Sequence, residues 1–308
     1  MLSDEQRKVR STGIGASETA AIMGLDPYRS AIDIYLRKLG LVEEDDSHHT
    51  KRGNYLEPAL RAWASDVIGK EFEPCDATFA KPSHPLVKAT PDGISWPSKA
   101  VLEIKSPGPR TWREWGEGDD APDRYVVQVA QQMLVTGCRE GYLVAFLGDD
   151  LRVYRFERDD ELEDEIVKTV ERFWREYVET QIPPSPDGSA SYREYLERKF
   201  PHSVRPQLIR ADSSTEGLMI ELRKAREERD RIVRDNALLE QRIKEIIGDA
   251  EGIESPDIGS VTWRNNKTSN VTDWEALARS LTPSAEKVAA FTKKKPGSRV
   301  FRPSFKDI

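Results

Sequence analysis

The sequence predicts an α/β (α+β) fold in which a mixed central sheet is flanked by helices. A helical, coiled-coil-like extension and a small β element are expected to follow it. Helical and strand-like patterns alternate between about residues 10 and 180, which is typical of a sheet covered by helices. The 308 residues suffice for one large domain and a smaller appendage. A seam of apolar residues at coiled-coil spacing predicts the extension.

Helical spacing of apolar residues appears in several stretches of the first part, namely residues 17–23, 30–39, 54–68, 123–136 and 160–180. The clearest apolar stripe lies in the third of these stretches and consists of Leu56, Ala59, Leu60, Trp63, Ala64 and Val67. These stretches are expected to supply the helices that cover the sheet.

Strand-like runs occupy residues 71–80, 86–90, 99–105, 140–147 and 151–157. Gly148-Asp149-Asp150 is a good hairpin turn between the last two runs. The alternation of these runs with the helices predicts the mixed sheet.

The Pro-, Gly- and Ser-rich stretch that begins at Gln181 predicts a domain boundary. We expect a first domain, the mixed sheet with its helices, at residues 1–180, a linker at 181–212, and a C-terminal long helix with a small α/β extension at 213–308. The long helix carries a seam with alternating spacings of four and three: Leu218, Leu222, Ala225, Arg229, Ile232, Asn236, Leu239, Ile243 and Ile246. This seam must pack either on the remaining chain or on another subunit.

Beyond residue 248 the pattern predicts a strand at residues 259–264, a short helix at 272–281 and a basic tail. The tail contains Lys293, Lys294, Lys295, Arg299, Arg302 and Lys306. A solvated surface is the favoured interpretation of this charge run, and a DNA-contacting arm is the alternative.

Composition excludes several classes of protein. The formal net charge of −7 argues against a protein that coats DNA electrostatically, but it leaves a nuclease open because carboxylates that gather for a metal raise the acidity locally. Cys75 and Cys138 are too few for a disulfide framework or a four-thiolate metal site, so reduced core residues are expected. The sequence shows neither a membrane span nor a signal peptide, so a soluble, cytoplasmic protein is expected.

The run Thr90-Pro91-Asp92-Gly93, followed by Leu102-Glu103-Ile104-Lys105, carries the strongest chemical signal. A hairpin with turn residues Gly93 and Ser95 to Ser98 would bring Asp92 beside Glu103. Because strand side chains alternate, Glu103 and Lys105 share one face, and Leu102 and Ile104 point to the core. Two carboxylates are hard ligands that suit Mg²⁺, which supports phosphodiester hydrolysis.

Lys105 beside a metal-bound water could orient or deprotonate that water. Partial burial and a nearby cation are expected to lower the pKa of Lys105 towards this task. The alternative is an ordinary surface Glu-x-Lys pair, which the Pro-Asp-Gly at hairpin distance makes less favoured.

Three further features each have an ordinary structural explanation. Glu57 precedes Pro58, which is typical of a helix's first turn, so Glu57 lies near the helix start or at a kink and can simply satisfy the helix dipole. Gln128 shares a helix face with Gln132 and could bind a water or a phosphate oxygen, but such amides are usually unremarkable. The glycine-bearing segment from Arg10 to Glu18 is either a phosphate cradle or a capped helix start.

The ordered set of motifs resembles the YqaJ-type viral recombinase family, relatives of lambda exonuclease within the PD-(D/E)XK nuclease superfamily. The resemblance covers residues 7–180 and rests on these segments: Gly13-Ile14-Gly15-Ala16-Ser17-Glu18, Ala21-Ile22-Met23-Gly24, Asp26-Pro27-Tyr28, Arg52-Gly53, Glu57-Pro58, Thr90-Pro91-Asp92-Gly93, Leu102-Glu103-Ile104-Lys105, and Tyr125 with Gln128. It implies a restriction-endonuclease-like fold.

The resemblance also implies roles for individual residues. Asp92 and Glu103, with Glu57 and the backbone carbonyl of Ile104, would bind Mg²⁺, for which Mn²⁺ can substitute. Lys105 and Gln128 would position the nucleophilic water, and Arg10 and Ser17 would hold the 5′ phosphate. One departure is that Ala130 stands where the family often has a second glutamine.

The implied activity is a 5′-to-3′ exonuclease that acts on ends of double-stranded DNA and leaves 3′ overhangs for phage-type recombination. The implied partners are a single-strand annealing protein and further copies of the chain, as a trimer, in a bacterial host cell. An endonuclease of the same superfamily and a non-catalytic DNA-binding scaffold are the alternatives.

Overall fold

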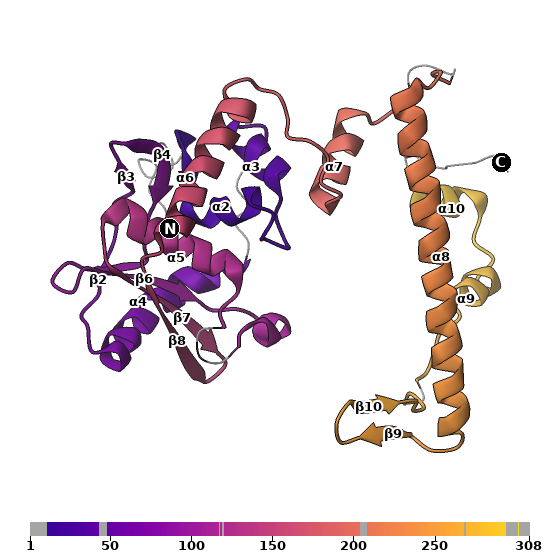
Figure 1. Cartoon of the computed structure of the whole chain (residues 1–308). Coiled ribbons are helices and arrows are strands. Elements are labelled where there is room, and N and C mark those ends of the chain that lie inside the picture. The colour runs from indigo at the N-terminus through magenta and orange to yellow at the C-terminus, as the bar shows by residue number, and fades with distance from the viewer. Residues whose placement is uncertain are drawn as a thin grey trace. The chain divides into compact units, whose positions relative to one another are not determined.

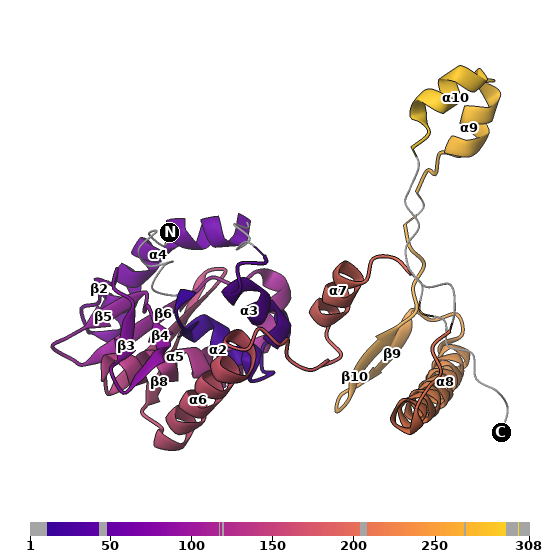
Figure 2. The same ribbon diagram turned by 90° about the horizontal axis from the view of Figure 1, so that it is seen from above.

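The computed structural model describes residues 11–42, 48–116, 118, 120–203, 208–267, 269–293 and 301, with the backbone alone for residues 48–50. The chain divides into two compact units, Met1–Lys199 and Phe200–Ile308, which are drawn in Figures 1 and 2. In the described part of the chain, every helix is too short or too polar to cross a membrane.

A five-stranded mixed sheet forms the centre of the first unit. Its order is β2 (Glu73–Pro74), β5 (Gly93–Ser95), β6 (Ala100–Lys105), β7 (Glu140–Leu147) and β8 (Asp150–Glu157). The pair β6 and β7 is parallel, and the other neighbours are antiparallel. The predicted α/β fold with a mixed central sheet is confirmed.

Helices α4 (His48–Ile68) and α5 (Asp123–Thr136) cover opposite faces of this sheet, as the alternation along β6 shows. Val101 packs with Val129 and Met133 of α5. Its neighbour Leu102 packs in a separate cluster with Ala64 of α4. Because successive strand side chains point to opposite faces, a strand buried between two helices is apolar on both sides.

Close contact between α5 and the sheet depends on one glycine. A Cβ atom at Gly141 of β7 would lie 2.3 Å from the side chain of Val129. Any larger residue there would push α5 away from the strands that it covers.

A second, smaller sheet has the order β1 (Ile14–Gly15), β4 (His84–Ala89) and β3 (Phe79–Lys81). Its core includes side chains of α2 (Ala16–Ile22), α3 (Ala31–Lys38), α6 (Asp160–Phe173), the short π-helix Trp174–Val178 and α7 (Ala190–Lys199). Helix α7 lies in the segment predicted as a linker, and its Tyr192 is buried.

Two strand predictions are corrected by the structure. The run predicted at residues 71–80 is two short strands, β2 and β3, which belong to different sheets. Pro74 ends β2, because proline has no N–H to continue the ladder. Gly93 and Ser95, expected in a turn, belong to β5, and the turn follows at residues 96–99, where Lys99 has φ +49°.

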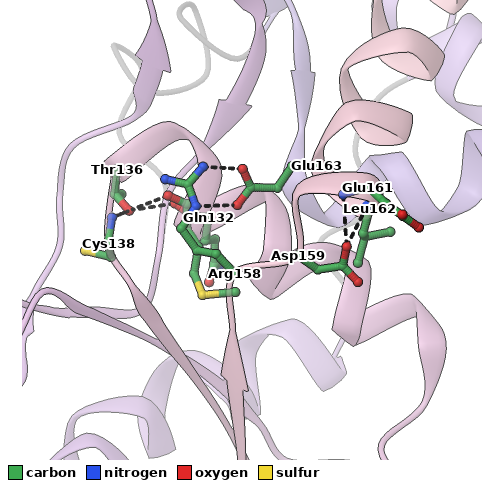
Figure 3. A network of polar contacts seen from close by, with 9 residues as sticks. Gln132, Thr136, Cys138, Arg158, Asp159, Glu161, Leu162 and Glu163 are labelled. Carbon is green, nitrogen blue, oxygen red and sulfur yellow. Dashed lines mark hydrogen bonds and ion pairs between the residues drawn. The ribbon is translucent and has the colours of Figure 1, made fainter.

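The predicted helices of the first unit are present, and their ends are closed by local contacts. Helix α5 ends at Gly137 in the left-handed conformation, and Asp159 caps α6 by accepting hydrogen bonds from the amides of Glu161 and Leu162. Figure 3 shows this cap, with Thr136 joining the Gln132 carbonyl to the Cys138 amide and Arg158 paired with Glu163. These contacts close the C-terminal end of α5 and the N-terminal end of α6.

The second unit contains α8 (Ser213–Ile247), the hairpin β9 (Gly252–Ser255) and β10 (Gly259–Thr262), α9 (Trp274–Ser280) and α10 (Ala285–Phe291). The predicted seam lies on one continuous helix, and its side chains Leu218, Ile232 and Leu239 are exposed. Of the basic tail, only Lys293 is among the described residues; Lys294, Lys295, Arg299, Arg302 and Lys306 lie outside them.

Candidate functional site

The hairpin β5–β6 brings Asp92 beside Glu103. Gly93 pairs with Leu102 in an antiparallel ladder, so Asp92, which directly precedes β5, stands across from Glu103. The amide of Ile104 donates a hydrogen bond of 2.7 Å to Oδ2 of Asp92. A backbone donor therefore fixes this carboxylate at the end of β6.

Glu103 is 2% exposed and is surrounded by donors. Its Oε1 accepts hydrogen bonds from Nε2 of Gln128, at 2.6 Å, and from Nζ of Lys105. Its Oε2 accepts from Nε2 of Gln132 at 2.5 Å. The predicted residues Asp92, Glu103, Lys105 and Gln128 are thus together at one end of β6, beneath α5.

Gln132 is a second glutamine that contacts Glu103, although Ala130 stands at the position where the family often has one. It lies one turn after Gln128 on α5, and both are buried against the same carboxylate. The side-chain oxygen Oε1 of Gln132 is buried and has no hydrogen-bond partner among the described residues. Gln132 therefore takes a place beside Glu103 although Ala130 interrupts the expected spacing.

The clustered charges shift the pKa values of two site residues. Burial, followed by the charges of Glu103 and Glu57, raises the pKa of Asp92 well above its usual 3.8. Burial lowers the pKa of Lys105, but the carboxylates of Glu103 and Asp92 outweigh it, so the pKa of Lys105 rises above 10.5. This reverses the direction expected from the sequence, because the carboxylates favour the ammonium form.

Glu57 lies inside α4 and not near its start. The helix begins at His48, so Pro58 is an internal proline and the first-turn interpretation is wrong. Glu57 forms an ion pair of 3.0 Å with Arg61, one turn later, and Arg61 also donates to the backbone carbonyl of Asp92 at 2.6 Å. The helix-dipole explanation of Glu57 therefore fails, and Arg61 connects Glu57 to Asp92.

The donor set fits Mg²⁺ through two carboxylates. Among the described residues, no group of three His, Cys, Asp or Glu side chains is arranged to hold a metal ion. Mg²⁺, however, keeps several water ligands and is commonly held by one or two carboxylates. Asp92 and Glu103 supply hard oxygens, and no hydrogen bond from a described residue reaches Oδ1 of Asp92.

The glycine-bearing segment is a tightly packed start of α2. A Cβ atom at Gly13 would lie 2.4 Å from the carbonyl oxygen of Leu86, so only glycine fits there. Glu18 accepts from the amide of Gly15 at 2.7 Å and pairs with Lys38 at 2.6 Å. Ser17 is partly buried in this segment, and Arg10 lies outside the described residues.

Helix α5 joins this segment to the carboxylates. Gln131 is fully buried and donates to the carbonyls of Ile14 on β1 and Lys88 on β4, at 3.0 and 2.8 Å. Its neighbours Gln128 and Gln132 hold Glu103. The predicted phosphate segment and the predicted metal site are therefore anchored to the same helix.

Sequence reasoning missed the contacts of Arg61, Gln131 and Gln132. Arg61 carried a usable signal, since it stands four residues after Glu57 and favours an ion pair. Gln132 shares a helix face with Gln128, which was visible in the sequence. Gln131 gave no such signal, because its partners are carbonyls of strands that are distant along the chain.

Packing explains the nearby tryptophan and the cysteines. Trp115 is 3% exposed and stacks on Tyr125 with ring centroids 5.1 Å apart. Cys75 and Cys138 are both free thiols, and Cys138 is buried. Trp115 is therefore a packing residue of the core.

Two solved structures of an alkaline exonuclease are similar to the first unit. The chain is 27% identical to an alkaline exonuclease, LHK-Exo of Laribacter hongkongensis, with a TM-score of 0.50 over 64% of this chain and 97% of that one. The structure of LHK-Exo in complex with dAMP gives 26% identity and a TM-score of 0.51 over the same shares. The first unit therefore has an alkaline-exonuclease-like fold.

Sequence comparison gives related proteins. The chain matches the model of the YqaJ-like viral recombinase domain over residues 6–139. It is 29% identical to the uncharacterized protein YqaJ of Bacillus subtilis (strain 168) over 256 residues, which are 82% of this chain and 80% of that protein. A mimivirus protein, R354, is 29% identical over 150 residues, 44% of this chain and 27% of that protein.

Proposed function

We propose that the protein is a Mg²⁺-dependent exonuclease that hydrolyses double-stranded DNA from its ends in the 5′-to-3′ direction and leaves 3′ overhangs for recombination. The observation that carries this proposal is the meeting of Asp92, Glu103 and Lys105 across the β5–β6 hairpin, with Gln128 above them. The similarity to an alkaline exonuclease over nearly its whole length supports a nuclease.

Asp92 and Glu103 would hold Mg²⁺, with Mn²⁺ able to replace it, and Glu57 and the carbonyl of Ile104 would complete the ligand set. The bound ion would activate a water and neutralise charge on the phosphate. Glu57 would have to release Arg61 or act through a water, because the two side chains form an ion pair at 3.0 Å.

Lys105 would supply a positive charge beside the metal site. Without the metal, the carboxylates of Glu103 and Asp92 raise the pKa of Lys105 and favour its ammonium form. An ammonium can orient the attacking water through a hydrogen bond and can stabilise charge that grows on the phosphate oxygens. Gln128 holds Glu103 in place, and its second amide hydrogen would donate to the same water.

Arg10 and Ser17 would hold the 5′ phosphate of the DNA end, which would set the direction of cleavage. The product class would be deoxynucleoside monophosphates, in keeping with the complex of LHK-Exo with dAMP. A single-strand annealing protein and further copies of this chain, as a trimer, are the partners that we propose.

The direct test replaces Lys105 by alanine and Glu103 by glutamine. Removal of a preorganised cation or of a metal ligand should lower the rate of Mg²⁺-dependent digestion of linear duplex DNA by about 100-fold or more. Release of acid-soluble nucleotides measures the rate, and circular dichroism measures folding.

Lys168→Ala is the matched control, because Lys168 is an exposed lysine on α6. It should digest DNA at the wild-type rate. Undiminished digestion by a folded Lys105→Ala variant would refute the site.

A further inference from the structure

Three segments meet in a small cluster of aromatic and charged side chains beside Lys105. Tyr28 comes from the loop between α2 and α3, Glu114 from the 3₁₀ helix Pro109–Glu114, and Arg124 and Tyr125 from the first turn of α5. We call Tyr28, Arg124 and Tyr125 the aromatic ledge. The proposed function uses none of these residues.

Glu114 holds two residues of the aromatic ledge, Tyr28 and Arg124, in place. The hydroxyl of Tyr28 donates a hydrogen bond of 2.9 Å to one oxygen of Glu114, and Arg124 pairs with the other. The guanidinium of Arg124 lies over both rings, 5.5 Å from the centroid of Tyr28 and 4.6 Å from that of Tyr125. The three side chains are therefore held in one arrangement by cation–π contacts and a shared carboxylate.

At one end, the aromatic ledge lies next to the carboxylate site. Nζ of Lys105 lies 5.0 Å from the ring centroid of Tyr125, so the last ring of the ledge faces the proposed catalytic ammonium. Trp115 stacks on this ring and supports it. A group bound on the aromatic ledge would therefore lie close to the ammonium of Lys105.

On the other side, the loop that carries Tyr28 is tied to the start of α2. Asp26 accepts from the amide of Tyr28 at 2.9 Å and forms an ion pair with Arg29 at 2.9 Å. Arg29 also donates to the backbone carbonyl of Ser17. Asp26 and Arg29 therefore connect the loop that carries Tyr28 to the backbone of the proposed phosphate residue Ser17.

Tyr28 is 61% exposed although its position is fixed. A large aromatic ring that is held in place and left in contact with water adds little to a core, but it loses little conformational entropy when it stacks on a ligand. Glu114 already neutralises Arg124, so the ledge is a poor phosphate site. A flat, uncharged ring is the ligand that it fits, and every nucleobase offers one.

We propose that Tyr28, backed by Arg124, is a stacking platform for a nucleobase of the DNA strand next to the cleaved phosphate. This inference rests on the proposed function and names the part of the substrate that the ledge holds. Because stacking needs only a ring face, the platform does not select a base sequence.

Binding of DNA tests the platform without turnover, in a Lys105→Ala background. The probe is a 5′-phosphorylated duplex with 2-aminopurine in its terminal nucleotides, whose fluorescence falls on stacking. Tyr28→Ala should raise the Kd about tenfold and relieve the quenching. Tyr28→Phe keeps the ring and should retain both. A duplex with abasic terminal nucleotides should bind Tyr28→Ala and the parent with equal Kd.

Trp96→Ala is the control, because Trp96 is another exposed aromatic, at the turn end of the β5–β6 hairpin away from Asp92. It should bind both duplexes like the parent. Unchanged binding and quenching in folded Tyr28→Ala would overturn the platform, and so would an equal loss for intact and abasic duplexes. The wild-type protein's digestion of linear DNA is measured separately. If the wild type does not digest linear DNA, the proposed function has failed; if it does, a negative binding result concerns the platform alone.

Discussion

Lys88 of β4 illustrates how a single residue departs from the usual rule that charges face water. It is 7% exposed, and burial lowers the pKa of its ammonium from the usual 10.5. No described residue forms an ion pair or hydrogen bond with its ammonium, and its side chain covers the backbone of Gly13. Lys88 therefore carries a desolvated charge beside the segment that contains Ser17.

Lys88→Met should stabilise the fold at neutral pH. The lysine of the unfolded chain is charged there, and folding must bury that charge, so its removal should raise the free energy of unfolding by about 1 kcal/mol. Because the folded pKa is the lower one, wild-type stability rises with pH towards 10.5 and the gain should shrink. Urea unfolding at pH 7 and pH 10 measures it, with exposed Lys168→Met as control. A less stable Lys88→Met at pH 7 would contradict this account.

Individual site residues could be predicted where the signal is local. Strand alternation placed Glu103 and Lys105 on one face, and the turn residues placed Asp92 opposite Glu103. The partners of Glu103 on α5 and the raised pKa of Lys105 depend on which helix covers β6, and no spacing within a strand records this.

At the scale of elements, Glu140 connects the start of β7 to β8 and to the segment after α4. Its carboxylate lies 2.7 Å from both Lys70 and Arg155 and accepts from the Tyr142 hydroxyl at 3.0 Å. The hydrogen bond from Lys70, with those of Arg155 and Tyr142, lowers the pKa of Glu140 from 4.5 to about 2. This cluster links β7 to β8 and to the segment after α4.

Glu140→Gln should therefore destabilise the first unit at neutral pH, by roughly 1 to 2 kcal/mol after allowance for solvent screening. Because the pKa of Glu140 is lower in the folded chain than in the unfolded chain, its ionised carboxylate stabilises the fold fully above pH 4.5. This stabilisation is lost as the pH falls through about 2, so the difference between Glu140→Gln and wild type should shrink over that window. Urea unfolding at pH 7 and pH 3 measures it.

Glu157→Gln is the matched control, because Glu157 also pairs with Arg155 but its side chain is 74% exposed. It should change the free energy of unfolding by less than about 0.5 kcal/mol. A Glu140→Gln deficit that is equal at pH 7 and pH 3 would contradict the role of this carboxylate.

The helices were predictable because their apolar periodicity is local, and each predicted helical stretch of the first unit overlaps one of α2 to α6. The strands β2 and β3 were not separable in the sequence, since membership of a sheet is decided by distant partners: β5 for β2, and β4 for β3. Helix α4 begins six residues earlier than its predicted start, which moved Glu57 from the helix start to its interior.

At the scale of the whole molecule, the two compact units differ in what they contain. The first unit holds the three apolar cores up to Tyr192 and every described residue of the carboxylate site. The second unit exposes the seam of α8. The sequence could predict this seam but not its partner, because heptad spacing is the same for a neighbouring helix and a second subunit.

The central claim is that the carboxylate site digests DNA from ends. The most direct measurement compares linear duplex labelled at its 5′-phosphorylated ends with a covalently closed circle of the same sequence, both with Mg²⁺. The account predicts release of the label as mononucleotide from the linear DNA and an intact circle. Nicking or linearisation of the circle at a comparable rate would contradict it and would indicate an endonuclease.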